Sequence, residues 1–251
     1  MVRNLLFTIE YDGSDFHGWQ RQPDVSTVQG TLEEVLGKLF CVPVEVDGTS
    51  RTDAGVHAVG QRATFAGTFG IPTERIKFAA NNMLPGSIHI SKVEEVPEGF
   101  HARFDARAKT YRYVIRNTQD KNVFDRNYCL YVGPDLDVQA MKAAAAQFVG
   151  THDFKSCQAS GGPEKLSTVR TISDLRVEKQ GDKITIEVTG DGFLYNMVRI
   201  IAGTLVEVGL GRIRPDRIQE ILLSKDRAQA GYTAPPQGLY LVQVYYERED
   251  L

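Results

Sequence analysis

The chain has 251 residues, of which 42% are hydrophobic and 24% charged, a composition typical of a globular protein of one or two domains that excludes overall disorder. Its 29 basic and 32 acidic residues give a net charge of −3, which excludes nucleic-acid binding by bulk positive charge but allows a local basic patch. The three cysteines lie far apart, which predicts neither a disulfide framework nor a zinc ribbon and suits a reducing compartment. We find no signal-peptide pattern and no apolar run long enough for a membrane span, so we expect a cytoplasmic protein that has no membrane partner.

The first half of the chain predicts strands and helices in alternation. Ser26 and Gln29 have the spacing of a capping box at the start of the first helix. Turn-forming residues at 48–55 join two of the strands. The expected strands are 5–11, 42–46, 58–65 and 88–96, and the expected helices are 28–40 and a segment within 73–83.

The second half repeats this rhythm without repeating the sequence. The expected strands are 111–116, 172–179, 183–189 and 239–246, and the middle two form a hairpin. The expected helices are 138–149 with Asp137 as N-cap and Gly150 as stop, an apolar stripe at 194–208, and 215–223 beginning at Pro215.

These elements predict an α/β (α+β) fold with a mixed, largely antiparallel sheet and helices packed on it. We expect two α/β halves, residues 1–105 and 106–251, because the strand–helix–strand order begins again near residue 106. No stretch rich in proline, serine or glycine marks a linker between them.

Several motifs for cofactors are absent from the sequence. It contains neither a phosphate-binding loop of the GxxxxGK type nor a dinucleotide-binding GxGxxG after a strand. The five histidines are dispersed, and none stands at zinc-ligand spacing from a cysteine. We therefore expect no cofactor and no metal site.

The motif at 51–55, Arg-Thr-Asp-Ala-Gly, places Asp53 two residues after Arg51 and two before Gly55. A nearby cation favours the ionised form of a carboxylate. An ionised and well-positioned aspartate can act as a nucleophile or as a base, and small neighbours allow a substrate to approach the backbone. The alternative is a plain turn in which Asp53 accepts backbone hydrogen bonds.

The segment 101–116 is rich in basic and aromatic residues. Five basic residues stand against one acid, and Phe104, Tyr111 and Tyr113 lie between them. Basic groups neutralise phosphates and aromatic faces stack on unpaired bases, so the segment suits RNA. The alternative is a solvated charged strand with core tyrosines, since Tyr111 and Tyr113 would share one face of a strand. The basic residues are Arg103, Arg107, Lys109, Arg112 and Arg116.

Arg199 lies within a strongly apolar predicted helix. A buried cation needs a carboxylate partner or an anionic ligand, and Asp53 is one acid that fits this role. The alternative is that the side chain extends from the helix to solvent.

Taken together, these blocks resemble the A class of tRNA pseudouridine synthases (the TruA family) over nearly the whole chain. Besides the motif at 51–55, the matching blocks are Glu-Tyr-Asp-Gly at 10–13, Gly-Trp-Gln-Arg-Gln at 18–22, Phe-His-Ala-Arg-Phe at 100–104, Tyr-Arg-Tyr at 111–113, Met-Val-Arg at 197–199 and Thr-Ala-Pro-Pro at 233–236. The sequence departs from the family pattern at Ser50, where glycine is more frequent, and at Tyr232, where proline is common.

The resemblance implies a role for each matching residue. Asp53 takes the position of the catalytic aspartate, and Tyr111 that of the tyrosine that stacks on the target uracil. Arg199 takes the position of the basic residue that pairs with the catalytic carboxylate, and Arg51 that of the arginine that helps to hold the place of the flipped nucleotide. We count Arg21, Arg103, Arg107, Lys109 and Arg112 as possible RNA contacts.

The resemblance also implies the reaction and the partners. The reaction would convert uridine to pseudouridine at positions 38–40 in the anticodon arm of tRNA, without a cofactor. The protein would be a homodimer whose two similar halves flank a central RNA-binding cleft. Three roles of Asp53 remain open: attack at C1′ of the ribose, attack at C6 of the base, and removal of a ribose proton.

Two other classes of protein compete with this interpretation. An RNA-binding module without catalysis shares the basic and aromatic segment, but it gives no reason for Asp53 beside Arg51. A small-molecule lyase or glycosidase is the second, and glycosidases usually need two cooperating carboxylates where we find one.

Overall fold

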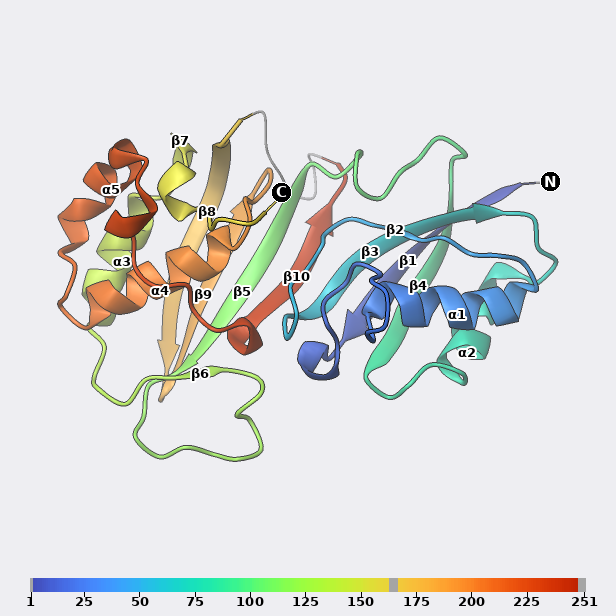
Figure 1. Cartoon of the computed structure of the whole chain (residues 1–251), viewed down its shortest axis with the longest axis horizontal. Coiled ribbons are helices and arrows are strands. Elements are labelled where there is room, and N and C mark those ends of the chain that lie inside the picture. Colours follow the sequence, from blue (N-terminus) through green and yellow to red (C-terminus); the bar gives the residue numbers. More distant parts are fainter. Residues whose placement is uncertain (1, 163–166, 248–251) are drawn as a thin grey trace. The chain divides into compact units, whose positions relative to one another are not determined.

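The computed structural model describes residues 2–162 and 167–247, and the chain forms two compact units. The first unit contains the residues up to 107 together with those from 240 onward, and the second contains residues 108–239. Figure 1 labels their elements in chain order. The sequence suggested 106–251 as one half, whereas in the structure the chain returns to the first unit at residue 240.

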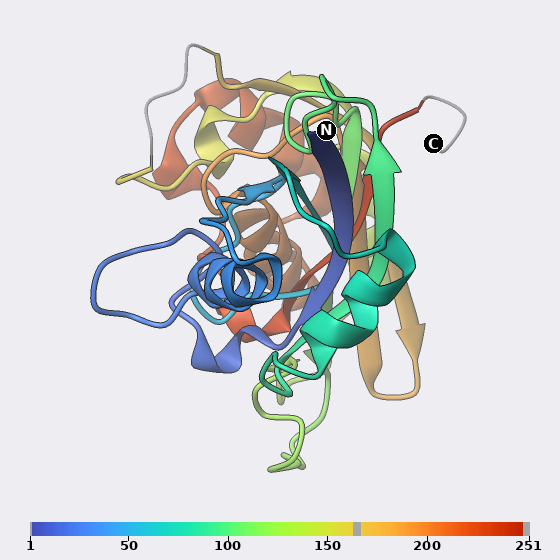
Figure 2. The same cartoon turned by 90° about the vertical axis from the view of Figure 1, so that its right-hand side faces the viewer.

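The first unit is a largely antiparallel group of strands with two helices. Strand β1 pairs antiparallel with β3 and β4, β2 pairs antiparallel with β3, and β10 lies parallel to β3 with Tyr240 opposite His57. Figure 2 shows α1 nearly end-on beside β1. Leu32 and Leu36 of α1 are fully buried, so the apolar spacing that predicts this helix forms part of the core. The elements are β1 (Arg3–Tyr11), the 3-10 turn η1 (Gly13–Asp15), α1 (Val28–Phe40), β2 (Asp47–Gly48), β3 (His57–Gly67), α2 (Thr73–Asn81), β4 (Ile88–Val96) and β10 (Leu239–Tyr245).

Two expectations for the first unit are wrong. The N-cap of α1 is Thr27 rather than Ser26, because the Thr27 side chain accepts the Gly30 N–H. Residues 42–46 form no strand; the short strand β2 follows them. Their polar groups find partners on α1 instead, since the Val46 N–H donates to the Glu33 carboxylate at 3.1 Å and its carbonyl accepts from Gln29 at 3.0 Å.

The second unit has the strand order β5-β9-β8-β7, all antiparallel, with β6 parallel to β5. The predicted hairpin is confirmed as β8 and β9. Nearly every residue of α4 is buried, and α4 packs against α3, where Gly209 leaves room for Met141. The elements are β5 (Ala108–Arg116), β6 (Leu130–Tyr131), α3 (Val138–Ala146), β7 (Gly150–Asp153), β8 (Val169–Gln180), β9 (Lys183–Gly190), α4 (Met197–Gly209), α5 (Ile218–Ser224) and the 3-10 turns η2 (Lys155–Cys157), η3 (Pro215–Arg217), η4 (Arg227–Gln229) and η5 (Pro236–Gly238).

Some boundaries in the second unit differ from the expected ones. Asp137 caps α3 as predicted, but the helix ends at Ala146, and Gly150 instead begins β7 with a φ of 118°. Pro215 begins a 3-10 turn, and α5 follows it at Ile218. These differences lie at helix ends, where short 3-10 turns replace α-helical geometry.

The predicted fold class is confirmed, since both units combine helices with mixed, mostly antiparallel strands, and only the pairs β3–β10 and β5–β6 are parallel among those described. Within the described ranges, no helix has both the length and the apolar character that a membrane span requires.

Candidate active site

The loop at 49–56 joins β2 to β3 in the first unit and carries Asp53. Arg51 is exposed, Thr52 is buried and Asp53 is half-buried. The Val56 N–H donates to the Asp53 carbonyl at 3.1 Å, and Gly55 has a φ of 76°, which favours glycine. The loop therefore contains a tight turn, in which Asp53 stands two residues after an exposed arginine and two before a glycine.

A network of buried polar side chains is hydrogen-bonded to this loop. Gln61 of β3 is fully buried, and its side-chain amide accepts the Ser50 N–H at 3.2 Å and donates to the Ser50 carbonyl at 2.7 Å. The hydroxyls of Tyr11 and Thr52 are hydrogen-bonded at 2.7 Å. The residues on both sides of Arg51 are thus fixed by buried hydrogen bonds, which are costly to break. Gln61 is not among the residues predicted from the sequence, although a glutamine in an apolar strand next to a motif is a usable signal.

The segment 12–19 supports the same loop from another side. The Trp19 N–H donates to the Thr52 carbonyl at 3.0 Å, and the Gly13 N–H donates to Nδ1 of His57 at 3.1 Å. Gly18 has a φ of 92°, and a Cβ there would lie 2.7 Å from the Thr52 carbonyl oxygen. The blocks at 10–13 and 18–22 are therefore parts of the wall on which the Asp53 loop rests.

His57 has a structural position in this wall. Its side chain is buried, and its ring stacks on Tyr240 with 4.8 Å between the centroids. Because Nδ1 accepts the Gly13 N–H, the imidazole ties β3 to the turn that follows β1. This supports a structural hydrogen bond as the role of His57.

Tyr111 and Arg112 lie on β5 in the second unit, and they point to opposite faces as the alternation predicts. Tyr111 is buried and contacts Phe193 edge-to-face with 5.2 Å between the ring centroids. Arg112 forms an ion pair with Glu187 of the neighbouring strand at 2.6 Å. The strand therefore carries a buried tyrosine on one face and a charged arginine on the other.

Arg199 is half-buried on α4, and its guanidinium is held by two described oxygen atoms. Its Nε donates to the Ala234 carbonyl at 2.7 Å, and its Nη1 donates to Oδ1 of Asn196 at 2.7 Å. The Ala234 N–H in turn donates to the Arg199 carbonyl at 3.1 Å. The expectation that this side chain only extends to solvent is incomplete, because protein groups fix the orientation of the guanidinium.

The Thr-Ala-Pro-Pro block at 233–236 is itself anchored to β5. The Tyr113 hydroxyl donates to the Pro235 carbonyl at 2.7 Å. Burial raises the pKa of Tyr113 above that of a free tyrosine, so the phenol stays protonated and remains a donor at neutral pH. This anchoring keeps the Ala234 carbonyl in place for Arg199.

The resemblance implies that Arg199 pairs with the catalytic carboxylate, so we predict that Asn196→Ala lowers kcat about tenfold, because the guanidinium of Arg199 loses a charge-assisted hydrogen bond. Asn196 also has a left-handed backbone with a φ of 58°, which asparagine tolerates better than alanine. Two variants separate the effects: Asn196→Gly relieves the backbone strain but lacks the amide, and Asn196→Asp keeps the oxygen acceptor. Steady-state kinetics should show a loss in Asn196→Gly and retained activity in Asn196→Asp; equal activity in all three variants contradicts the prediction.

The basic residues counted as possible RNA contacts are divided between the two units. Arg21 is exposed and pairs with the buried Glu33 at 3.2 Å, and Arg103 and Arg107 are exposed in the first unit. Lys109 lies on β5 in the second unit, as does Arg112. Their roles in RNA binding therefore stay predictions, and Arg112 and Arg21 already have acidic partners.

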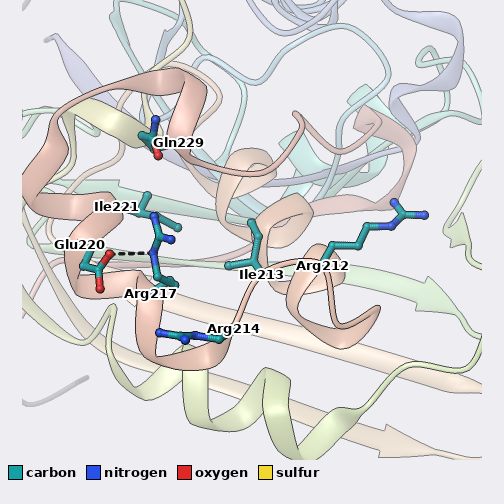
Figure 3. Close-up of a pocket in the computed structure, with 7 residues that line it drawn as sticks. All are labelled: Arg212, Ile213, Arg214, Arg217, Glu220, Ile221 and Gln229. Atoms are coloured by element: carbon teal, nitrogen blue, oxygen red, sulfur yellow. Dashed lines mark ion pairs between the residues drawn. The ribbon is translucent and has the colours of Figure 1, made fainter.

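The second unit contains a cavity of about 380 Å³, which is lined by other residues (Figure 3). Three arginines line it, and each has an acidic partner: Arg217 pairs with Glu220 at 2.7 Å, Arg214 with Asp216 at 3.0 Å and Arg212 with Glu207 at 3.1 Å. The local charge is balanced, and none of the predicted site residues lines this cavity. Within residues 2–162 and 167–247, no three histidines, cysteines or carboxylates gather as metal ligands would.

Comparison with protein families identifies the chain. A family model described as tRNA pseudouridine synthase matches residues 8–105 and 144–247. The chain therefore belongs to the tRNA pseudouridine synthase family. Asp53, Arg51 and Arg199 lie within the matched residues, whereas Tyr111 lies between the two matched segments.

Close relatives extend this match over nearly the full length. The chain is 50% identical over 246 residues to a protein of Ruminiclostridium cellulolyticum and 49% identical over 245 residues to one of Acetivibrio thermocellus. A protein of Thermoanaerobacter is 47% identical over 245 residues. Each alignment covers 98% of this chain and 100% of the relative, and all three relatives are named tRNA pseudouridine synthase A.

Proposed function

We propose that the protein isomerises uridine to pseudouridine in tRNA, at positions 38–40 of the anticodon arm. The observation that carries the proposal is the family match, within which Asp53 occupies a loop fixed by buried hydrogen bonds. In this proposal the protein acts as a cytoplasmic homodimer, and both units carry residues that the family pattern assigns to the reaction.

The reaction needs a positioned group rather than a cofactor. It must break the C1′–N1 bond, turn the uracil and join C5 to C1′, while C5 loses a proton and N1 gains one, so there is no net oxidation or reduction. We propose that the ionised Asp53 attacks C1′, attacks C6 or removes a ribose proton, all of which need a fixed carboxylate. The Gln61 and Tyr11 hydrogen bonds supply that fixation, because they leave the loop little freedom to move.

The target uridine must first leave the helical stack, at a cost of a few kcal/mol. We propose that Tyr111 stacks on the extruded uracil, and the edge-to-face contact with Phe193 fixes its ring. Arg51 then helps to hold the place that the nucleotide leaves. Arg199, which Asn196 and Ala234 orient, takes the position of the basic residue that the family pattern pairs with the catalytic carboxylate.

We predict that Tyr111→Ala lowers kcat/KM about 10- to 100-fold, because stacking on a base is worth roughly 1–3 kcal/mol. Tyr111→Phe keeps the ring and should retain most of this activity if stacking is the main contribution. Kinetics with a tRNA transcript measure both variants. An equal loss in the phenylalanine variant would assign the effect to the hydroxyl instead.

The proposal is tested with the wild-type protein and a tRNA transcript that has uridines at 38–40. Mass spectrometry should locate pseudouridine in the anticodon arm, and a transcript with cytidine at these positions should stay unmodified. If the protein binds the transcript and forms no pseudouridine, it is an RNA-binding module rather than an enzyme. Pseudouridine elsewhere in the tRNA would support the reaction and overturn the assignment of positions.

A further inference from the structure

Phe104 is an aromatic side chain that the fold leaves outside the core. It is 76% exposed, although it lies in the block 100–104 and its neighbour Ala102 is fully buried. The His101 ring lies 4.3 Å from it between centroids, and the Arg103 guanidinium lies 5.8 Å from its centroid. The Phe104 ring is therefore available at the surface, with a histidine and an arginine beside it.

A closed turn holds Phe104 outward. The Asp105 carboxylate accepts the His101 N–H at 2.7 Å, and the Asp105 N–H donates to the His101 carbonyl at 3.1 Å. The Arg103 N–H donates to Nδ1 of His101 at 3.1 Å. The turn is therefore rigid, and the ring is presented to solvent rather than left on a loose loop.

This turn is fastened to the base of the Asp53 loop within the first unit. The Ala102 carbonyl accepts hydrogen bonds from the Thr49 hydroxyl at 2.9 Å and from the Tyr246 hydroxyl at 3.0 Å. The chain from Thr49 to Asp53 spans four residues, about 14 Å at most, and Phe104 follows Ala102 by two residues. The turn that carries Phe104 is thus hydrogen-bonded to the first residue of the Asp53 loop within the first unit.

The chemistry of the surface around Phe104 suits RNA. An exposed aromatic ring offers a face on which an unpaired base can stack, and this needs no particular base. Arg103 is exposed beside the ring, Arg107 is exposed three residues further along the chain, and both can contact phosphates. The Asp105 carboxylate, the acid of this turn, is used by the backbone N–H of His101.

We propose that Phe104, flanked by His101 and Arg103, is a stacking platform for a second unpaired base of the RNA, close in sequence to the target uridine. This inference rests on the proposed function, because it assumes an RNA whose target nucleotide lies at Asp53. The platform holds the strand beside the target, so it contributes to RNA affinity and not to the chemical step.

Equilibrium binding of a tRNA transcript tests the platform independently of activity. Phe104→Ala should weaken the Kd about tenfold, whereas Phe104→Trp should restore it to the wild-type value or better. The matched control is Phe78→Ala: Phe78 is 68% exposed in the same unit and also has a cation beside it, Lys77 at 5.9 Å from its ring centroid. The control should bind as the wild type does.

Fluorescence reports stacking directly. The Phe104→Trp variant should lose tryptophan emission when the transcript is added, beyond the change seen with Phe78→Trp, which corrects for Trp19 and for bulk effects. An unchanged Kd in Phe104→Ala, or equal quenching in the two tryptophan variants, overturns the platform. A wild type that binds the transcript but forms no pseudouridine overturns the proposed function instead, while the binding results still decide on the platform.

Discussion

Asp53→Asn is expected to abolish pseudouridine formation, with a loss of at least about 10³-fold in rate, while the affinity for tRNA stays close to that of the wild type. Asparagine has nearly the shape of aspartate and keeps one oxygen acceptor, so the loop should hold its conformation. The asparagine side chain carries no charge, and at neutral pH it acts neither as a nucleophile nor as a base. The measurement is single-turnover modification of a tRNA transcript, with binding measured in parallel.

The matched control is Asp15→Asn, an exposed carboxylate in the turn η1 beside the Asp53 loop. It changes the net charge by the same amount and in the same unit, so it separates a local catalytic role from a general loss of negative charge. We expect wild-type activity in the control. Turnover by Asp53→Asn at a rate comparable to the control would exclude Asp53 as the group that reacts with the uridine.

The candidate site residues could be named from the sequence because their signals are local, and their roles stay predictions. The spacing of Arg51, Asp53 and Gly55 within one turn predicts a positioned carboxylate without any knowledge of the fold. The helical stripe around Arg199 likewise predicts a cation that needs partners. In both cases, residues a few positions apart carry the signal, and local geometry fixes what they can do.

The supports of the site could not be predicted in the same way, because their partners lie far apart in the chain. Gln61 reaches Ser50 across 11 residues, and Thr52 reaches Tyr11 across 41. The Ala234 carbonyl that orients Arg199 is 35 residues away from it. Such pairs depend on strand register and on the return of the chain, neither of which appears in local periodicity.

The strand wrongly predicted at 42–46 also shows that local periodicity does not reveal hydrogen-bond partners. Alternating burial is present there, since Val44 and Val46 are buried and Pro43 and Glu45 are exposed. The side chains follow the strand pattern, but the backbone of Val46 bonds to side chains of α1. Periodicity reports which face is buried, and it does not report which group satisfies the backbone.

Gly13→Ala is expected to damage both the fold and the reaction, because the support of the Asp53 loop leaves no room for a methyl group. A Cβ on Gly13 would lie 2.0 Å from the Val56 carbonyl oxygen and 2.6 Å from its carbon, which are backbone atoms and cannot rotate away. The N–H of Val56 donates to the Asp53 carbonyl and closes the turn that carries Asp53. Relief of the clash must therefore displace that turn. We expect the free energy of unfolding to fall by about 1–3 kcal/mol.

The same displacement should lower kcat about 100-fold at temperatures where the variant is fully folded, since a shift of about 1 Å in a catalytic group costs that much. The affinity for tRNA should change far less, because Gly13 lies behind the loop. Gly70→Ala is the matched control, since its added Cβ would meet no atom within 4 Å. Thermal unfolding followed by circular dichroism gives the stability, and single-turnover kinetics give the rate. A Gly13→Ala variant that is destabilised but fully active would mean that the position of Asp53 does not depend on the segment 12–19. Fixation of the loop would then not be needed for the reaction.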